Sequence, residues 1–376
     1  MKILHISLHY IDGWGYQDNL LPLYQVDAGH DVVVAADWEH LPAGQRKSIE
    51  EKGDRYPDDG VMVRRFHTSL CTSDSALCCQ GLMKILEEES PDLVFHHGIH
   101  FPTLLVASRY RRRHPDSVLM ADSHADPFNV SRNRIWRKFY SEGLLRLLVR
   151  KTRKQVDRYY GVTPLRCEFL ETEFRVPKEK IALLPLAGDS RFLQEIPENI
   201  AEIRATYSIP DRAFLLVTGG RMGRSKGTDR VIDAWQRLRE RFPDMELLLF
   251  GSLEPDFRVP EGVHLLGWCD RVTTCAVLKM ADVAVWPLFH TTLVEDALVY
   301  GTPVIVKDSG NVSHHKAAGV CVTLETGDTG EIVDAVRTIL EEKSVIHSKL
   351  QSYSHLCSYE QVVSRIGADY WHIKKA

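Results

Sequence analysis

The hydrophobic pattern of residues 213–250 changes its period twice. Ala213–Val217 and Glu246–Phe250 are short and almost continuously apolar, which is typical of parallel strands that are covered on both faces. Between them lies a run with helical spacing, for which Thr228 is the expected N-cap. Its apolar face is formed by Val231, Ile232, Trp235 and Leu238. The change from strand to helix and back predicts a βαβ unit, and a chain built from such units forms a parallel α/β sheet.

Further units of this kind lie on both sides of residue 200. In the second half, strands are expected at Val283–Trp286 and Pro303–Val306. In the first half they are expected at Lys2–Ser7, Asp31–Ala36, Leu93–His96 and Val118–Ala121. We predict an α/β protein with two Rossmann-like, doubly wound domains that face each other across a cleft. Ligands of such sheets bind outside the carboxyl ends of the strands, so the strand-end loops are the first place to look for function.

The length of 376 residues is enough for two domains. We place the first at residues 1–185 and the second at 186–357, and expect a helix at 358–376 from its apolar spacing. The composition, with 44% hydrophobic and 26% charged residues, is that of a globular protein.

The eight cysteines show no CxxC spacing and no histidines at the spacing of a zinc site. No apolar run approaches the length that crosses a bilayer, and the chain starts directly in strand-like sequence. We therefore expect a cytoplasmic protein without a signal peptide.

Residues 217–227 form a glycine-rich stretch between a predicted strand and a predicted helix, with Arg221 and Lys226 five residues apart. Glycines allow the backbone to approach an anion closely, and the two side chains supply the charge that a diphosphate requires. The stretch matches neither the Walker loop nor GxGxxG. A solvated basic turn is the alternative interpretation.

The second informative stretch runs from Trp286 to Pro303. A strand ends at Trp286, and a short helix is expected to begin near Thr291 or Thr292 and to end at Gly301. Threonine hydroxyls and backbone N–H groups there can hold a phosphate, and Glu295 can accept hydrogen bonds from ribose hydroxyls. The alternative is a capping box, with Thr292 as N-cap and Glu295 as its partner.

Together these two stretches resemble the carboxyl-terminal half of retaining, nucleotide-sugar-dependent glycosyltransferases of the GT-B fold, especially glycosyltransferase family 4. Gly220-Arg221-Met222 and Lys226-Gly227 match the family's Gly-Arg-Leu and Lys-Gly pattern. The resemblance implies that Arg221 and Lys226 contact the donor diphosphate as catalytic residues and that Gly220 and Glu295 belong to the donor site. It also implies a front-face reaction with retention, although a double displacement stays open.

The resemblance has two further implications for the domain arrangement. Gly188 and Asp189 are similar to the hinge that follows the first half in the family, so they are expected to set the geometry of the connection. As in relatives, the helix at 358–376 is expected to pack back on the first domain.

The chain departs from the family motif at one position. The family has a second Glu eight residues before the one matched by Glu295, and Pro287 stands there. A shortened loop follows, as in a subset of similar enzymes, and we include its residues in the donor site: His290, Thr291, Thr292 and Leu293. No Asp-x-Asp occurs in the sequence, so we expect neither a metal ion nor a cofactor.

In the first half, the loop after the first strand resembles the family's flexible glycine-rich loop near the acceptor and the donor phosphate. Its candidate residues are Gly13, Gly15, Tyr16 and Gln17. A dinucleotide fingerprint is the alternative, but its third glycine is absent. Relatives use a histidine in this region, for which His124 is the first choice and His97 the second. A structural histidine is the alternative for either one.

Residues 132–158 alternate basic and apolar side chains at helical spacing, and residues 101–160 as a whole carry 14 Lys or Arg against 5 Asp or Glu. Such a segment can contact an anionic membrane surface at the inner face of the cell membrane, and related transferases use this region to reach lipid-linked acceptors. The alternative is a helix that buries its leucines and leaves its cations in water. We expect no nucleic-acid partner, because the cleft motifs would have no role in binding one.

We therefore expect a metal-independent retaining glycosyltransferase that moves a sugar from a nucleotide-sugar donor, with UDP as the expected nucleotide, to a glycan or lipid-linked acceptor in cell-surface polysaccharide synthesis. Two alternatives stay open at this point. One is a nucleotide-sugar epimerase of the same fold, and the other is a non-catalytic nucleotide-sugar-binding module.

Overall fold

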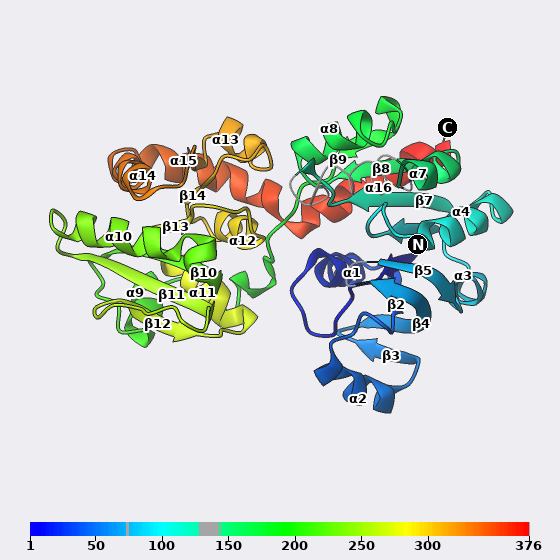
Figure 1. Ribbon diagram of the computed structural model, residues 1–376, viewed down its shortest axis with the longest axis horizontal. Coiled ribbons are helices and arrows are strands. Elements are labelled where there is room, and N and C mark those ends of the chain that lie inside the picture. The colour runs from blue at the N-terminus through cyan, green and yellow to red at the C-terminus, as the bar shows by residue number, and fades with distance from the viewer. Residues whose placement is uncertain (73–74, 128–142, 144, 376) are drawn as a thin grey trace. The chain divides into compact units, whose positions relative to one another are not determined.

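The computed structural model describes residues 1–72, 75–127, 143 and 145–375. The chain divides into two compact units (Figure 1). The first comprises Met1–Pro185 and Val362–Ala376, and the second comprises Leu186–Gln361. The fold is mixed α/β with a largely parallel sheet in each unit, as the sequence predicts.

The first unit alternates strands and helices along most of its length. Its elements are β1 (Lys2–Ser7), α1 (Gln17–Asp27), β2 (Asp31–Asp37), α2 (Ala43–Lys52), β3 (Arg55–Asp58), β4 (Val61–Thr72), β5 (Ser75–Gln80), α3 (Leu82–Glu89), β6 (Leu93–His96), α4 (Thr103–Arg113), β7 (Val118–Ser123), α7 (Arg146–Thr152), β8 (Arg158–Gly161), α8 (Pro164–Thr172), the 3-10 helix η2 (Lys178–Lys180), β9 (Ile181–Leu183) and most of α16 (Tyr359–Lys375).

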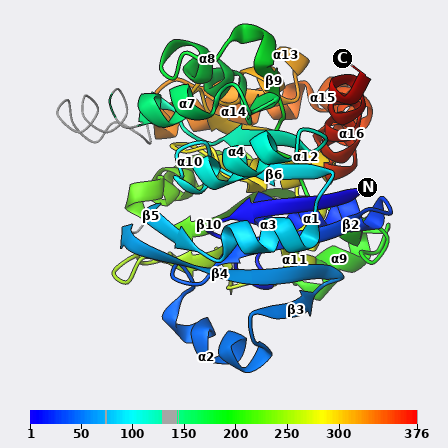
Figure 2. The same ribbon diagram turned by 90° about the vertical axis from the view of Figure 1, so that its right-hand side faces the viewer.

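The sheet of the first unit, as far as the described residues show it, has the order β3-β4-β2-β1-β6-β7-β8-β9, and β5 pairs with β4. Strands β1, β2, β6, β7, β8 and β9 pair in parallel, while β3 and β5 run antiparallel to β4. Helices α3 and α4 lie beside each other against this sheet (Figures 1 and 2). Their apolar faces, with those of α7 and α8, form one core with the strands. The carboxyl ends of β1, β6 and β7 are neighbours as a result.

Helix α16 is tied to the first unit by polar contacts as well as by apolar packing. The Tyr160 hydroxyl donates to Asp369 at 2.7 Å, and Arg365 donates to the carbonyl of Leu183 at 2.6 Å. Val362, Ile366 and Tyr370 are buried on its apolar face. The last helix of the chain therefore completes the first unit.

The second unit repeats the α/β pattern with a smaller sheet. Its elements are η3 (Arg191–Leu193), α9 (Ile200–Thr206), β10 (Phe214–Met222), η4 (Arg224–Lys226), α10 (Thr228–Arg239), β11 (Met245–Leu253), β12 (His264–Gly267), α11 (Arg271–Met280), β13 (Val283–Trp286), α12 (Leu293–Val299), β14 (Val304–Lys307), α13 (Ser313–Ala318), β15 (Cys321–Leu324), α14 (Thr329–Glu341), α15 (Lys343–Tyr353) and η5 (Ser354–Cys357).

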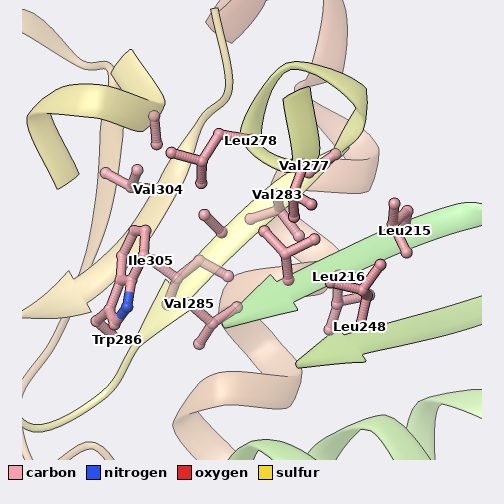
Figure 3. Packing of buried hydrophobic residues seen from close by; sticks show 14 of the residues in the cluster. Leu215, Leu216, Leu248, Val277, Leu278, Val283, Val285, Trp286, Val304 and Ile305 are labelled. Carbon is pink, nitrogen blue, oxygen red and sulfur yellow. The ribbon is translucent and has the colours of Figure 1, made fainter. Parts of the chain in front are cut away.

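All the strand pairs of the second unit are parallel, in the order β12-β11-β10-β13-β14-β15. The four central strands, β10, β11, β13 and β14, are largely buried on both faces, which explains their apolar sequences. Figure 3 shows the core between β10, β11, β13 and β14, with Trp286 at the end of β13. The Trp286 indole donates to the carbonyl of Gly219 at 3.1 Å. This bond links the ends of β13 and β10.

The structure corrects two boundaries in the glycine-rich stretch. Strand β10 continues to Met222, so Gly219, Gly220 and Arg221 are strand residues that pair with β11 and only 223–227 form the loop. Glycines allow this close pairing, because a Cβ on Gly251 would lie 2.1 Å from the carbonyl oxygen of Gly220. Helix α10 begins at Thr228, and its N-cap is Gly227 with φ of +76°. Thr228 instead accepts from the N–H of Gly223 at 3.0 Å through its hydroxyl.

Candidate functional site

Arg221 and Lys226 lie at the carboxyl end of β10 and in the loop that follows. Both side chains are exposed. Neither forms an ion pair with a carboxylate in the part of the chain that the structure describes. The nearby Glu254 is bonded to the backbone of Arg224 and to the Ser225 hydroxyl. Both cations are therefore available to an anionic ligand.

The loop at 223–227 lies directly against the segment that begins at Pro287. A Cβ on Gly227 would lie 2.9 Å from Pro287 and 3.0 Å from Leu288. The ammonium of Lys226 lies 4.1 Å from the ring centroid of Phe289. The structure thus brings together two stretches that are about 60 residues apart in the sequence.

The start of α12 joins the same group of residues. The side chain of Leu293 lies 3.5 Å from the position of a Cβ on Gly220. Thr291 and Thr292 precede the helix and are half-buried. The predicted donor-site residues of the second unit therefore come from one end of its sheet.

Glu295 is fully buried in the first turn of α12, and two histidines hold one of its oxygens. Its Oε1 accepts from His290 Nε2 at 2.7 Å and from His315 Nε2 at 3.3 Å. The His315 Nδ1 lies 3.1 Å from the hydroxyl of Tyr353. The other carboxylate oxygen, Oε2, is buried and has no hydrogen-bond partner among the described residues.

These contacts exclude the capping-box interpretation. Thr292 is the N-cap residue of α12, but its side chain makes no capping hydrogen bond. Glu295 points to the histidines instead of to the backbone of residue 292. Burial raises the pKa of Glu295, but the charges and hydrogen bonds of His290 and His315 outweigh it and hold the pKa well below its ordinary value. Glu295 is thus a buried, ionised carboxylate.

His314 lies next to this cluster and was not expected from the sequence. Its ring centroid is 3.9 Å from that of His315. Both of its ring nitrogens are buried without a hydrogen-bond partner among the described residues. Burial and the charge of His315 lower its pKa to about 3, so the imidazole is neutral. The sequence offered one signal for this residue: two adjacent histidines follow a strand and the turn at Gly310.

The backbone behind Glu295 is fixed by the segment that opens the second unit. A Cβ on Gly188 would lie 2.5 Å from the carbonyl oxygen of Glu295. The N–H of Asp189 donates to Asp296 at 2.9 Å. Arg271 forms a two-pronged pair with Asp296 and also lies 3.4 Å from Asp189. Within this unit, Gly188 and Asp189 therefore hold α12 in place.

In the first unit, Asp122 at the carboxyl end of β7 collects several predicted residues. Its Oδ2 accepts from Gln17 at 3.2 Å and lies 3.1 Å from His97 Nδ1. His124, which is half-buried, lies 3.6 Å from the same oxygen. The N–H of Gly98 donates to Oδ1 at 2.8 Å. Three of the predicted residues thus share one buried carboxylate, which the sequence interpretation did not single out.

A third histidine, His5, extends this cluster into the interior. The Nε2 of His97 lies 3.0 Å from Nδ1 of His5, whose Nε2 lies 2.6 Å from the amide oxygen of Gln25. Burial lowers the pKa of His97, but the carboxylates of Asp18 and Asp122 outweigh it and raise the pKa. Burial and the charge of His97 lower the pKa of His5 to about 3. A protonated His97 that donates to both Asp122 and a neutral His5 satisfies all of these distances.

The remaining predicted residues of the first unit lie in the loop before α1. Gly13 is exposed and has φ of +73°, which only glycine adopts easily. Gly15 is half-buried, and Tyr16 is exposed and forms the N-cap of α1. The rings of Trp14 and Tyr16 pack edge to face, with centroids 5.2 Å apart.

The basic stretch at 132–158 lies partly outside the described residues. In the described part, α7 buries Leu148 and Val149 in the core, whereas Leu147 and Arg150 are exposed. A hollow of about 500 Å³ opens beside it, lined by Arg146, Leu147, Arg150, Arg153, Phe174 and Arg175. In the described part, Leu148 and Val149 therefore belong to the protein interior, whereas Leu147 and Arg150 face solvent.

The described residues contain no group of three or more His, Cys, Asp or Glu side chains that is arranged to hold a metal ion. No helix within the same residues is long and apolar enough to cross a membrane.

Residues 213–342 match the family model described as "Glycosyl transferases group 1". A D-inositol 3-phosphate glycosyltransferase of Paenarthrobacter aurescens is 26% identical over 188 residues, which cover 46% of this chain and 44% of that protein. An uncharacterised glycosyltransferase of Methanocaldococcus jannaschii is 22% identical and matched over 58% of its length. The chain thus spans about half the length of the curated relatives it matches.

Solved structures resemble the fold over nearly the whole chain. The Anabaena protein HepE, solved in complex with UDP, superposes with a TM-score of 0.70 at 14% identity, covering 98% of this chain and 99% of that one. The UDP-GlcNAc 2-epimerase of Neisseria meningitidis, solved with UDP-GlcNAc, has a TM-score of 0.63 at 14% identity, covering 99% of this chain and 100% of that one. At these identities the likeness concerns the fold, and it confirms the predicted GT-B class.

Proposed function

We propose that the protein is a retaining glycosyltransferase. Two findings support this: residues 213–342 match the group 1 glycosyltransferase model, with motifs that resemble glycosyltransferase family 4, and the chain has a GT-B fold. The donor is a nucleotide sugar, with UDP as the nucleotide, and the acceptor is a glycan or a lipid-linked glycan in cell-surface polysaccharide synthesis. The observation that carries the proposal is the convergence of Arg221, Lys226 and the buried carboxylate of Glu295 at one end of the second unit's sheet.

The two cations fit the role of diphosphate ligands. A nucleoside diphosphate carries its charge on oxygens that accept hydrogen bonds, and charge-assisted hydrogen bonds to them are about twice as strong as neutral ones. Arg221 and Lys226 are exposed and have no carboxylate partner in the described residues. The hydroxyls of Thr291 and Thr292 lie on the adjoining segment and supply further donors. We infer that these groups neutralise the leaving diphosphate in place of a divalent ion.

The proposed reaction breaks the bond between the anomeric carbon and the diphosphate oxygen and forms a bond from the acceptor oxygen to the same face of that carbon. The acceptor proton passes to an oxygen of the departing diphosphate. In this scheme Arg221 and Lys226 act by stabilising the charge that develops on the leaving group. We further propose that His97 and His124, held by Asp122 in the first unit, contact the donor sugar or the acceptor.

The proposal is tested by a screen of nucleotide sugars for thermal stabilisation, followed by turnover with an acceptor panel. A ligand at about 100 times its Kd raises stability by about 2.7 kcal/mol, which such a screen detects easily. Transfer to an acceptor, with the anomeric configuration kept in the NMR spectrum of the product, supports the proposal. Inversion at the anomeric carbon would contradict the retaining mechanism.

The same experiment separates the two alternative functions. The epimerase alternative keeps its place because an epimerase shares the fold at a TM-score of 0.63. It predicts a changed sugar configuration without any acceptor. A non-catalytic binding module predicts stabilisation by nucleotide sugars with no turnover. The match of residues 213–342 to the group 1 family favours the transferase over both.

We also propose that the protein contacts an anionic membrane surface through the basic side of α7. The cations that support this are Arg150, Arg153 and Arg175, which line the same hollow as the exposed Leu147. A basic residue near an anionic surface contributes about 1 kcal/mol. Co-sedimentation with liposomes containing anionic lipid should weaken when Arg150 and Arg153 are changed to Gln. The absence of binding by the wild type at low salt would refute the contact.

A further inference from the structure

Phe289, in the segment between β13 and α12, covers one side of a cation of the candidate site. Phe289 is 50% exposed. The ammonium of Lys226 lies over its ring, 4.1 Å from the ring centroid. An ammonium within about 6 Å of the centroid is attracted by the negative face of an aromatic ring. Lys226 is also exposed and has no carboxylate partner in the described residues, so this contact is what holds its ammonium there.

The backbone behind this ring is packed between two glycines. A Cβ on Gly227 would lie 2.9 Å from Pro287, and a Cβ on Gly327 would lie 2.0 Å from the carbonyl oxygen of Pro287. The turn at Gly327 is held in its turn by Arg230 of α10, which donates to the carbonyl of Gly327 at 3.0 Å. The start of the segment that carries Phe289 is therefore held from both sides.

An aromatic ring orders a lysine in a way that suits a diphosphate site. A free lysine side chain loses its rotamer freedom when it binds a ligand, which costs about twofold to tenfold in affinity. A contact that orders the ammonium beforehand removes part of this cost. A carboxylate would also order it, but would cancel the charge that the phosphates need. The Phe289 ring leaves the charge in place and leaves the other side of the ammonium open.

We propose that Phe289 is a positioning residue whose ring holds the Lys226 ammonium ready for the donor diphosphate. This inference rests on the proposed function, in which Lys226 is a diphosphate ligand. It adds to the donor site a residue that the sequence motifs did not select. The ring acts through Lys226, so its effect on binding should require both the lysine and the phosphates of the ligand.

The contact is tested first without any ligand. In protein that contains isotope-labelled lysine, the ring current of Phe289 should shift the NMR signal of the Lys226 ε-protons upfield. The signal is assigned by its loss in Lys226→Gln. Phe289→Leu should return it to the position of ordinary exposed lysines, whereas Phe289→Tyr should keep it shifted. A Lys226 signal at the ordinary position in the wild type would overturn the proposal.

Isothermal titration calorimetry then compares the affinities for UDP and for uridine, with ADP, GDP and their nucleosides as parallel arms. We expect Phe289→Leu to weaken UDP binding about twofold to fivefold and to leave uridine binding unchanged. Phe289→Tyr keeps a ring and should bind UDP like the wild type. Phe289→Met gives the same comparison if the leucine variant does not fold.

Phe242 provides a matched control in the same unit. It follows the end of α10 that is opposite to the loop at 223–227, and the guanidinium of Arg241 lies 5.8 Å from its ring centroid. Phe242→Leu therefore removes a phenylalanine from beside a cation that has no place in the candidate site. This variant should bind both UDP and uridine like the wild type.

A double-mutant cycle links the ring to the lysine. In a Lys226→Gln background, Phe289→Leu should have no further effect on UDP affinity. Unchanged UDP affinity in Phe289→Leu, an equal loss for UDP and uridine, or an undiminished loss in the Lys226→Gln background would each overturn the proposal. If the wild type binds no nucleoside diphosphate, the proposed function fails and the positioning role fails with it, while the ligand-free spectrum still shows whether the contact forms.

Discussion

The close pairing of β10 with β11 places Arg221 at the site. A substitution that adds a single methyl group to β11 tests this pairing. Gly251 has φ of +113°, and a Cβ there would lie 2.1 Å from the carbonyl oxygen of Gly220. That oxygen belongs to the backbone and cannot move aside without shifting β10. We therefore expect Gly251→Ala to carry two costs: backbone strain of about 1–3 kcal/mol and overpacking of about 1–3 kcal/mol.

Gly267 offers a matched control in the same unit. Its φ is +70°, but no atom lies within 4 Å of a Cβ built on it. Gly267→Ala should therefore cost only the backbone strain, about 1–2 kcal/mol. The difference between the two variants isolates the contact between Gly251 and Gly220, and we expect it to be about 1–3 kcal/mol.

Urea unfolding followed by tryptophan fluorescence measures this difference. Trp235 and Trp286 are both buried in the core of the second unit and report on its unfolding. Gly251→Ala should also weaken UDP binding, because Arg221 follows Gly220 directly in β10. The reasoning fails if the two alanine variants unfold at the same urea concentration and with the same slope.

Three further predictions concern charge and burial. The pKa of Glu295 is depressed in the folded protein, so its ionised form contributes stability above about pH 4.5 that is lost as the pH falls through the lower folded pKa. Denaturation at several pH values should therefore show that the stability deficit of Glu295→Gln relative to wild type shrinks on acidification. A constant deficit would contradict this. The pKa of His97 is raised, so its protonation contributes stability that is complete below about pH 6.5 and is lost as the pH rises through the folded pKa. NMR titration of the His97 ring should show a lower pKa in Asp122→Asn than in wild type. An unchanged titration would exclude the contact between His97 and Asp122. His290→Phe removes a charge-assisted hydrogen bond from a buried carboxylate and should destabilise the protein by about 1.5–3 kcal/mol in urea unfolding. His290→Gln should be closer to wild type in stability. An equal loss of stability in the two variants would mean that the ring fills space and does not hold Glu295.

The sequence predicted the architecture well because its strands are buried on both faces. Runs such as Leu247–Phe250 and Val283–Trp286 are too uniformly apolar for any other place in a protein. The limits of β10 were harder to predict. Glycines 219 and 220 suggest a loop when they are considered alone, and only the pairing with β11 shows why a strand needs them there.

The candidate site was predicted where motifs are local and missed where contacts join distant segments. Arg221, Lys226 and Glu295 were proposed from short motifs, whereas the contact between Glu295 and His315 spans 20 residues and depends on how α13 packs. Asp122 was visible at a strand end, but its link to Gln17 crosses 105 residues. Local spacing contains no information about such contacts, so the histidine clusters became visible only in three dimensions.

The most direct test of the account compares the binding affinity of UDP with that of uridine, which lacks the diphosphate. The proteins are wild type, Arg221→Gln, Lys226→Gln and a control, Arg237→Gln, which changes an exposed arginine of α10. If the two cations bind the diphosphate, calorimetry should show UDP affinity falling about tenfold or more in each site variant, with uridine affinity unchanged and the control like the wild type. Equal UDP affinity in all four proteins would contradict the account.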